Sequence, residues 1–242
     1  MDFLVKIIFI CTRSITFNTF LKSQAEYFMK KGFKVEVACS DIEDIKLEEN
    51  SIHLINFPKK ILDLFNIKNY FKVHKQIRNL VKKNPGALFY LHTPVASHFF
   101  RFFNFFNKLK IIYFVHGFRF TAESNFIKKF FFKIIENILS FKTQIFITIN
   151  NEDYKYAKLN LINKNSLCYK IKGVGLELKK RVLKNKKKIR KILVIAAYKK
   201  EKGYLDILKV AEMLKNYDIK IICYGSGDHH KFNLMKSKKK LV

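Results

Sequence analysis

The sequence of 242 residues contains no tryptophan, only three prolines and four cysteines. The cysteines form no C-x-x-C pair, which argues against a zinc site and is typical of reduced core thiols in the cytoplasm. The start, MDFLVKIIFICTR, lacks the basic leader of a signal peptide. The uncharged stretch 84–100 contains two prolines and two histidines, so it does not read as a membrane span. We therefore expect a cytoplasmic protein, free or held peripherally on the cytoplasmic face of a membrane.

Acidic residues are also scarce: 19 Asp and Glu stand against 48 Lys and Arg, a net charge of +29. This excess indicates an anionic partner such as lipid headgroups or a nucleotide diphosphate. The abundance of Lys, Ile, Asn and Phe is equally typical of an AT-rich genome, and the charge is spread rather than confined to one stripe. No recognised RNA- or DNA-binding motif is present, so we expect no nucleic-acid partner.

Short apolar runs alternate with longer amphipathic stretches, which predicts an α/β protein with a parallel sheet wrapped by helices. The expected strands are 4–11, 33–39, 52–56, 87–91, 110–115, 143–149 and 167–171. The expected helices are 18–31, 66–83, 94–107, 124–139 and 151–161, the last with Asn150 or Asn151 as its N-cap.

The pattern begins again near residue 190. Strands are expected at 191–196 and 219–224, with a helix at 203–216 between them. We predict a complete Rossmann-like domain over 1–178, a basic linker over 179–190, and an incomplete second Rossmann-like domain over 191–242.

Ligands of open parallel sheets bind at the carboxyl ends of the strands, so the residues after each strand are candidates for a site. Thr12, Arg13, Ser14 and Thr16 follow the first strand, where a helix start favours an anion. A polar turn capped by Thr16 or Asn18 is the alternative. The dinucleotide fingerprint G-x-G-x-x-G is absent.

Histidines follow two further strands. His92 precedes a helix start at Thr93–Pro94, and either faces a cleft or is satisfied at the strand end. His116 stands before Gly117, which leaves room for close approach of a ligand. Its imidazole is suited to hydrogen-bond a sugar hydroxyl or developing charge, with a structural histidine as the alternative.

The second unit carries a basic loop and then a glycine-rich loop. Lys199, Lys202 and Gly203 lie next to a helix start, where a cation and free N–H groups suit a diphosphate. Gly225 and Gly227 follow the next strand and would let a nucleotide approach the backbone. The pair His229–His230 lacks partners at ligand spacing, so we expect no metal.

The helix expected near 126–139 has a wide Phe/Ile face. Together with the cluster RFFNFFNKLK at 101–110, it fits either an anionic membrane interface or the interior of a Phe-rich core. Its polar face on a helical wheel consists of Lys129, Lys133, Glu136 and Asn137.

Several stretches resemble the bacterial family 4 (group 1) glycosyltransferases, most closely those of capsular and exopolysaccharide assembly. They cover most of residues 4–228, in the family's order and spacing. The stretches are ICTRSITFNTFLKSQAEYFMKKGFKVEVACSD, HTPVASHFFRF, IIYFVHGFRF, ITINNEDYKYAK, IKGVGLEL, AAYKKEKGYLDILKVAEMLK and CYGSGD.

This resemblance implies the two-domain GT-B fold and transfer of a sugar from a nucleotide donor with retention of configuration, without a required metal or other cofactor. The first domain would hold a saccharide acceptor, often lipid-linked, and the second the nucleotide sugar. His116 would face the transferred sugar, and Lys202 would contact the donor diphosphate. The loop 12–16 would line the cleft.

The chain departs from the family at two points. Ala197 stands where many members have an Arg five residues before the Lys, and the paired glutamates of the family, spaced E-x7-E, belong beyond Gly227. We therefore expect a carboxy-terminally truncated enzyme with weak or no transfer alone, or half of a split enzyme completed by a second polypeptide. The rival hypothesis is a non-catalytic module that binds acceptor or membrane.

Overall fold

The computed structural model describes residues 5–48, 51–58, 67–120, 125–164, 166–175 and 191–227. The chain divides into two compact units, Met1–Glu177 and Leu178–Val242. The predicted linker over 179–190 and the pair His229–His230 lie outside the described residues.

The first unit is built on a parallel sheet of seven strands in the order β3-β2-β1-β4-β5-β6-β7. Every strand expected in this unit is present, which confirms the α/β class. The strands are β1 Lys6–Ile10, β2 Lys34–Cys39, β3 Ile52–Leu54, β4 Leu88–His92, β5 Lys110–Val115, β6 Ile145–Thr148 and β7 Leu167–Lys170.

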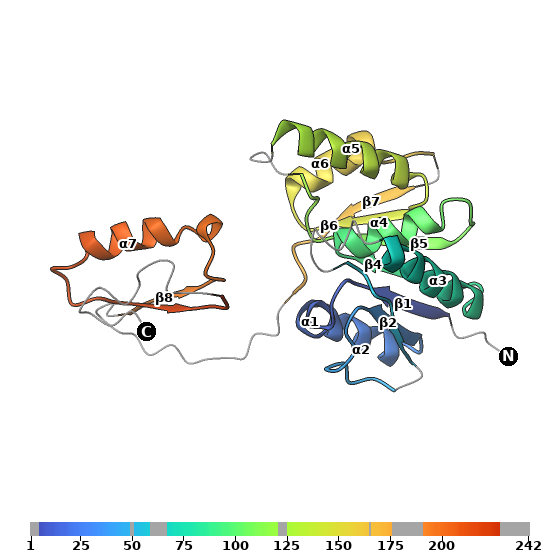
Figure 1. Ribbon diagram of the computed structural model, residues 1–242, viewed down its shortest axis with the longest axis horizontal. Helices are drawn as coiled ribbons and strands as arrows, with labels where there is room; N and C mark the ends of the chain where they lie inside the picture. Colours follow the sequence, from blue (N-terminus) through green and yellow to red (C-terminus); the bar gives the residue numbers. More distant parts are fainter. Residues whose placement is uncertain are drawn as a thin grey trace. The chain divides into compact units, whose positions relative to one another are not determined.

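Helices cover both faces of this sheet (Figure 1). Leu21 and Ala25 pack on one face, and Val73, Phe100 and Ala157 on the other. Because both faces are buried, the strands read as continuous apolar runs. The helical segments are α1 Ser14–Thr16, a π-helix Phe17–Leu21, α2 Lys22–Lys30, α3 Ile67–Lys83, α4 Pro94–Phe103, α5 Phe126–Ser140 and α6 Asn151–Asn160.

The structure corrects the prediction at two helix ends and decides between the predicted alternatives at a third. The first helical segment begins at Ser14 with Arg13 at its N-cap, so the prediction of a cap at Thr16 or Asn18 was wrong. α4 ends at Phe103, short of the expected 107, where the Asn104 side chain bonds the Phe100 carbonyl at 2.9 Å. Asn150 caps α6, as predicted, by accepting from the Asp153 N–H at 2.8 Å.

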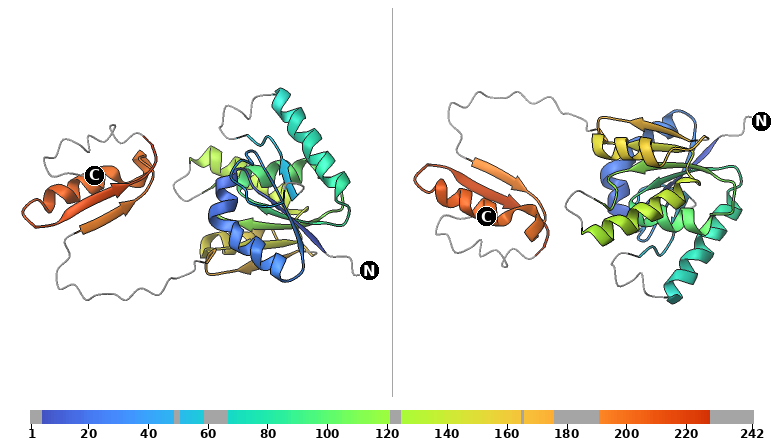
Figure 2. Two further views of the ribbon diagram at one scale, coloured as in Figure 1. Left: turned by 90° about the horizontal axis from the view of Figure 1, so that it is seen from below. Right: turned by 90° about the horizontal axis from the view of Figure 1, so that it is seen from above.

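The second unit pairs two parallel strands, β8 Lys191–Ile195 and β9 Lys220–Tyr224. A short 3-10 turn, Lys200–Lys202, leads into α7, Tyr204–Met213, which packs on both strands (Figure 2). These elements match the strand–helix–strand unit expected from the sequence.

Candidate active site

The central strands of the first unit bring the predicted site residues to one edge. β1, β4 and β5 are adjacent in the sheet, and all run in the same direction. Their carboxyl ends therefore place Thr12, His92 and His116 side by side. Parallel sheets bind ligands at this edge, so it is the candidate active site.

The two histidines form a pair. His92 Nδ1 and His116 Nε2 lie 3.2 Å apart, which is a hydrogen bond with one ring as donor and the other as acceptor. His92 is fully buried and stacks on Phe9 with ring centroids 5.5 Å apart, while His116 is half-buried. Of the two alternatives for His92, the one in which it faces the cleft is therefore wrong, because the ring is buried at the strand end and hydrogen-bonds His116.

Burial holds both imidazoles neutral. It lowers the pKa of His116 to about 4. Burial, and then the charge that His116 would carry, lowers the pKa of His92 well below its usual range. At neutral pH, His116 therefore presents an uncharged ring that has a fixed partner on one nitrogen and can hydrogen-bond a ligand through the other.

The loop after β1 is tied to its neighbours. Thr12 Oγ1 and Thr93 Oγ1 are 2.7 Å apart, and the Thr12 N–H donates to the same Thr93 oxygen at 3.1 Å. Thr93 occupies the N-cap of α4 with a positive φ of 64°, yet its side chain makes no capping bond. The hydroxyl instead bridges the ends of β1 and β4.

The anion expected at the start of α1 is supplied by the protein itself. Asp41, which follows β2, accepts the Ser14 N–H at 2.5 Å, and its other oxygen lies 3.4 Å from Arg13 Nε. Arg13 is exposed and Ser14 is buried. The Ser14 N–H is thus occupied by a carboxylate that the sequence reasoning missed, although Asp41 obeys the same strand-end rule.

Gly117 and Thr16 complete the predicted cleft residues. Gly117 has a φ of 141°, a backbone conformation that favours glycine, and a Cβ built there would meet no atom within 4 Å. The space next to His116 is therefore open, as the prediction required. Thr16 lies at the end of α1 and is only partly exposed.

The predicted donor residues of the second unit cluster at the start of α7. Lys199 lies just before the 3-10 turn and Lys202 is its last residue, and both are exposed. Gly203 takes a left-handed conformation at the N-cap of α7 with φ 73°. Gly203 has no side chain that could cap the first N–H groups of this ten-residue helix. The cationic Lys202 stands next to it in the chain, and this arrangement suits a phosphate.

The glycine-rich loop has a structural role. A Cβ at Gly225 would lie 1.8 Å from the Ala196 carbonyl oxygen, and Tyr198 N–H donates to the Ser226 carbonyl at 2.8 Å. The loop therefore packs against the segment that follows β8. The atom closest to a Cβ at Gly225 is a backbone atom of the same second unit. Gly227, with φ 112°, also needs its glycine conformation.

Among the residues that the structure describes, no group of three or more His, Cys, Asp and Glu could hold a metal ion. No helix within the described ranges is long and apolar enough to cross a membrane.

Comparison with known proteins agrees with this geometry. The family described as "Glycosyl transferase 4-like" matches residues 6–150, which run from β1 to the N-cap of α6 and include the whole His92–His116 edge. The Bacillus subtilis (strain 168) protein EpsD, a candidate glycosyltransferase, is 27% identical over 176 residues. That alignment covers 71% of this chain and 44% of EpsD.

Solved structures show the fold. UDP-N-acetylglucosamine 2-epimerase from Rickettsia bellii aligns with a TM-score of 0.62 and 13% identity, over 97% of this chain and 65% of the epimerase. A glycosyltransferase from Rickettsia africae ESF-5 aligns with a TM-score of 0.59 and 16% identity, over 96% of this chain and 63% of its own. The chain thus has a GT-B-like fold and spans less than two thirds of each of these proteins.

Proposed function

Because the chain belongs to the glycosyl transferase 4-like family, we propose that it takes part in the transfer of a sugar from a nucleotide donor to a saccharide acceptor. The observation that carries the proposal is the neutral His116 at the carboxyl edge of the sheet, inside the segment that matches the family. The acceptor is proposed to be lipid-linked, in surface polysaccharide or glycolipid assembly, and transfer to retain configuration without a metal.

The residues divide the work between the units. His116, held by His92, would hydrogen-bond the sugar as charge develops on it, and such a preorganised group acts mainly on the transition state. Thr12 and the space beside Gly117 would border the acceptor. Lys202 and the N–H groups that open α7 would bind the diphosphate and stabilise it as it leaves.

Lys202→Ala is expected to weaken binding of UDP or GDP sugars by about 10-fold or more, since one hydrogen bond to a charged group contributes about 1.5–3 kcal/mol. Isothermal titration of the full chain with a panel of these nucleotides at moderate salt measures the change. Lys209→Ala is the matched control, because Lys209 also lies on the surface of α7 and its side chain is 80% exposed. Equal affinities for both variants, or binding no tighter than that of pyrophosphate, would contradict the assignment of the donor site.

The pH dependence of kcat/KM for transfer should reflect the low pKa of His116. The ordinary pKa of histidine is about 6.5, and in the folded protein that of His116 is about 4. Since the neutral ring is the active form, kcat/KM should hold level from pH 8 to 5 and fall only as the pH approaches 4. A loss of rate centred near pH 6.5, with circular dichroism unchanged, would show that His116 does not carry the step.

A further inference from the structure

Helix α5 is oriented opposite to the usual amphipathic helix, because its phenylalanines face outward and its acidic residue faces inward. Glu136 is 1% exposed, whereas Phe126 and Phe130 are 79% and 60% exposed. At about 100° per residue, the outward side chains fall within an arc of roughly 140°. The large apolar residues exposed along α5 and just after it are Phe126, Ile127, Phe130, Phe131, Ile134, Ile138 and Phe141.

A buried cluster of charges fixes this orientation. Glu136 Oε2 pairs with Arg101 Nη2 at 2.8 Å, and Glu136 Oε1 meets His98 Nε2 at 2.7 Å. Both partners belong to α4, and Arg101 is fully buried. Rotating α5 to hide its phenylalanines would expose Glu136 and leave the Arg101 charge buried without a partner, which is strongly unfavourable. The outward apolar face is therefore held in place.

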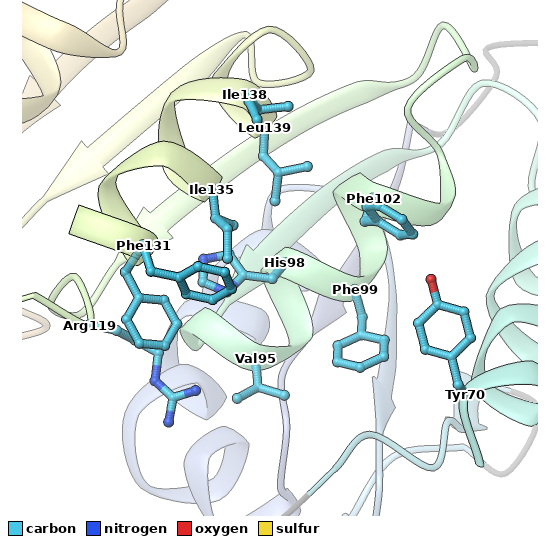
Figure 3. A pocket seen from close by; sticks show the side chains of 11 residues that line it. Tyr70, Val95, His98, Phe99, Phe102, Arg119, Phe131, Ile135, Ile138 and Leu139 are labelled. Carbon is cyan, nitrogen blue, oxygen red and sulfur yellow. The ribbon is translucent and has the colours of Figure 1, made fainter. Parts of the chain in front are cut away.

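An apolar groove lies between α4 and α5. Figure 3 shows Phe99 and Val95 of α4 facing Phe131 and Ile135 of α5 across it, with Arg119 at one end. The cavity has a volume of about 480 Å³, comparable to many ligand sites. Tyr70 of α3 continues the lining on the other side, so the apolar surface extends over three helices.

Within the described residues of α3, α4 and α5, the exposed charge has one sign. No Asp or Glu occurs between Asp63 and Glu123 in the sequence. In the described residues 67–120 and 125–142 the one acid is Glu136, which is buried and paired. The exposed lysines nearest to the apolar side chains in the sequence are Lys68, Lys72 and Lys108.

We propose that the surface formed by α3, α4 and α5, the docking face, binds an anionic lipid bilayer. The phenylalanines of α5 would enter the boundary between headgroups and hydrocarbon, the groove would take a lipid chain, and the lysines would contact headgroup phosphates. A second copy of the chain is a poorer occupant, because it would bring lysines of the same sign against this face. The inference does not depend on glycosyl transfer.

Co-sedimentation of the full chain with vesicles tests the proposal. We expect binding to vesicles of phosphatidylcholine with about one third phosphatidylglycerol, and at least 10-fold weaker binding to phosphatidylcholine alone. The double variant Phe126→Ser/Phe130→Ser should bind the anionic vesicles at least 10-fold more weakly, although it keeps every lysine. Both side chains are exposed, so its melting temperature should stay close to that of the parent chain.

Two matched controls separate insertion from general charge attraction. Tyr27→Ser/Leu159→Ser removes side chains that are 57% and 82% exposed on other helices of the same unit, and should bind as the parent does. Lys68→Gln/Lys72→Gln should weaken binding more than Lys209→Gln/Lys215→Gln, which removes the same charge from the second unit.

Three outcomes would overturn the proposal. The first is equal binding by the phenylalanine variant and the parent chain. The second is an equal loss for the two lysine variants. The third is self-association in sedimentation velocity that Phe126→Ser/Phe130→Ser abolishes, without vesicle binding by the parent.

Discussion

Replacing His116 with alanine is expected to lower the rate of glycosyl transfer by about 100-fold or more, since removal of one preorganised hydrogen-bonding group from an active site costs about 10²–10³ in rate. The ring is neutral, half-buried and fixed by His92 at 3.2 Å, so no energy is spent on orienting it during the reaction. Steady-state rates with a nucleotide sugar and a saccharide acceptor measure the effect. Nucleotide affinity should not change, because the predicted diphosphate residues belong to the other unit.

Two further histidine variants test whether the loss of rate is specific to His116. His74→Ala, which removes a partly buried ring on α3 that packs against Phe103, should leave the rate close to that of the parent. His92→Leu should cause an intermediate loss, since it frees His116 without removing it. A His116→Ala rate within a few-fold of the parent would contradict the proposed role. Conversion of the donor sugar to its epimer in the absence of an acceptor would also contradict this role. That reaction should be measured because the chain shares its fold with an epimerase.

Glu136→Ala is expected to lower the free energy of unfolding of the first unit by about 3–5 kcal/mol, the usual cost of removing one partner from a buried ion pair. The loss arises because Arg101, which is fully buried, would keep its charge without Glu136 to balance it. Urea unfolding followed by circular dichroism gives the value. Glu26→Ala is the matched control in the same unit. Its pair with Lys22 is exposed at 3.8 Å and should contribute less than about 1 kcal/mol.

The Glu136–Arg101 pair should make the free energy of unfolding depend on pH in the acid range. Burial raises the pKa of Glu136, but the charge of Arg101 and then that of His98 outweigh it and lower the pKa to about 2. The stabilisation is therefore complete above the ordinary pKa of about 4.3, and is lost as the pH falls from there through 2. In Glu136→Gln this part of the acid dependence should disappear. If parent and variant lose stability in parallel below pH 4, Glu136 is not charged in the folded protein.

The strands were predictable from the sequence because they depend on local composition. The central strands are buried on both faces of the sheet, so apolar runs such as residues 6–10 identify them without knowledge of their neighbours. The strand-end rule then located His116 and Thr12 correctly at one edge. Whether Lys202 and Lys199 bind a donor stays a prediction.

The errors came from partners distant in the sequence. Glu136 was placed with the polar residues of its helix, but Arg101, 35 positions earlier, draws it inside, and the wheel alone cannot show this. The Asp41 carboxylate at the start of α1 and the Thr12–Thr93 bridge join loops that are 27 and 81 positions apart. The packing of Gly225 against the Ala196 carbonyl was not foreseen either, while its contact with a nucleotide stays a prediction. In each case the two partners are far apart in the sequence, so the pattern around one residue does not indicate its contact with the other.

The position of β1 between β2 and β4 has a consequence for synthesis on the ribosome. Ile7 pairs with Val35 on one side and with Leu88 on the other, so the second edge of β1 stays unpaired while roughly 80 more residues are made. At about 5–20 residues per second this lasts about 4–16 seconds. During that interval the nascent chain carries an open apolar strand edge, which is a template for wrong pairing. The slow step of folding should therefore be the arrival of β4, and shielding of the first 90 residues by a chaperone should raise the yield of folded protein.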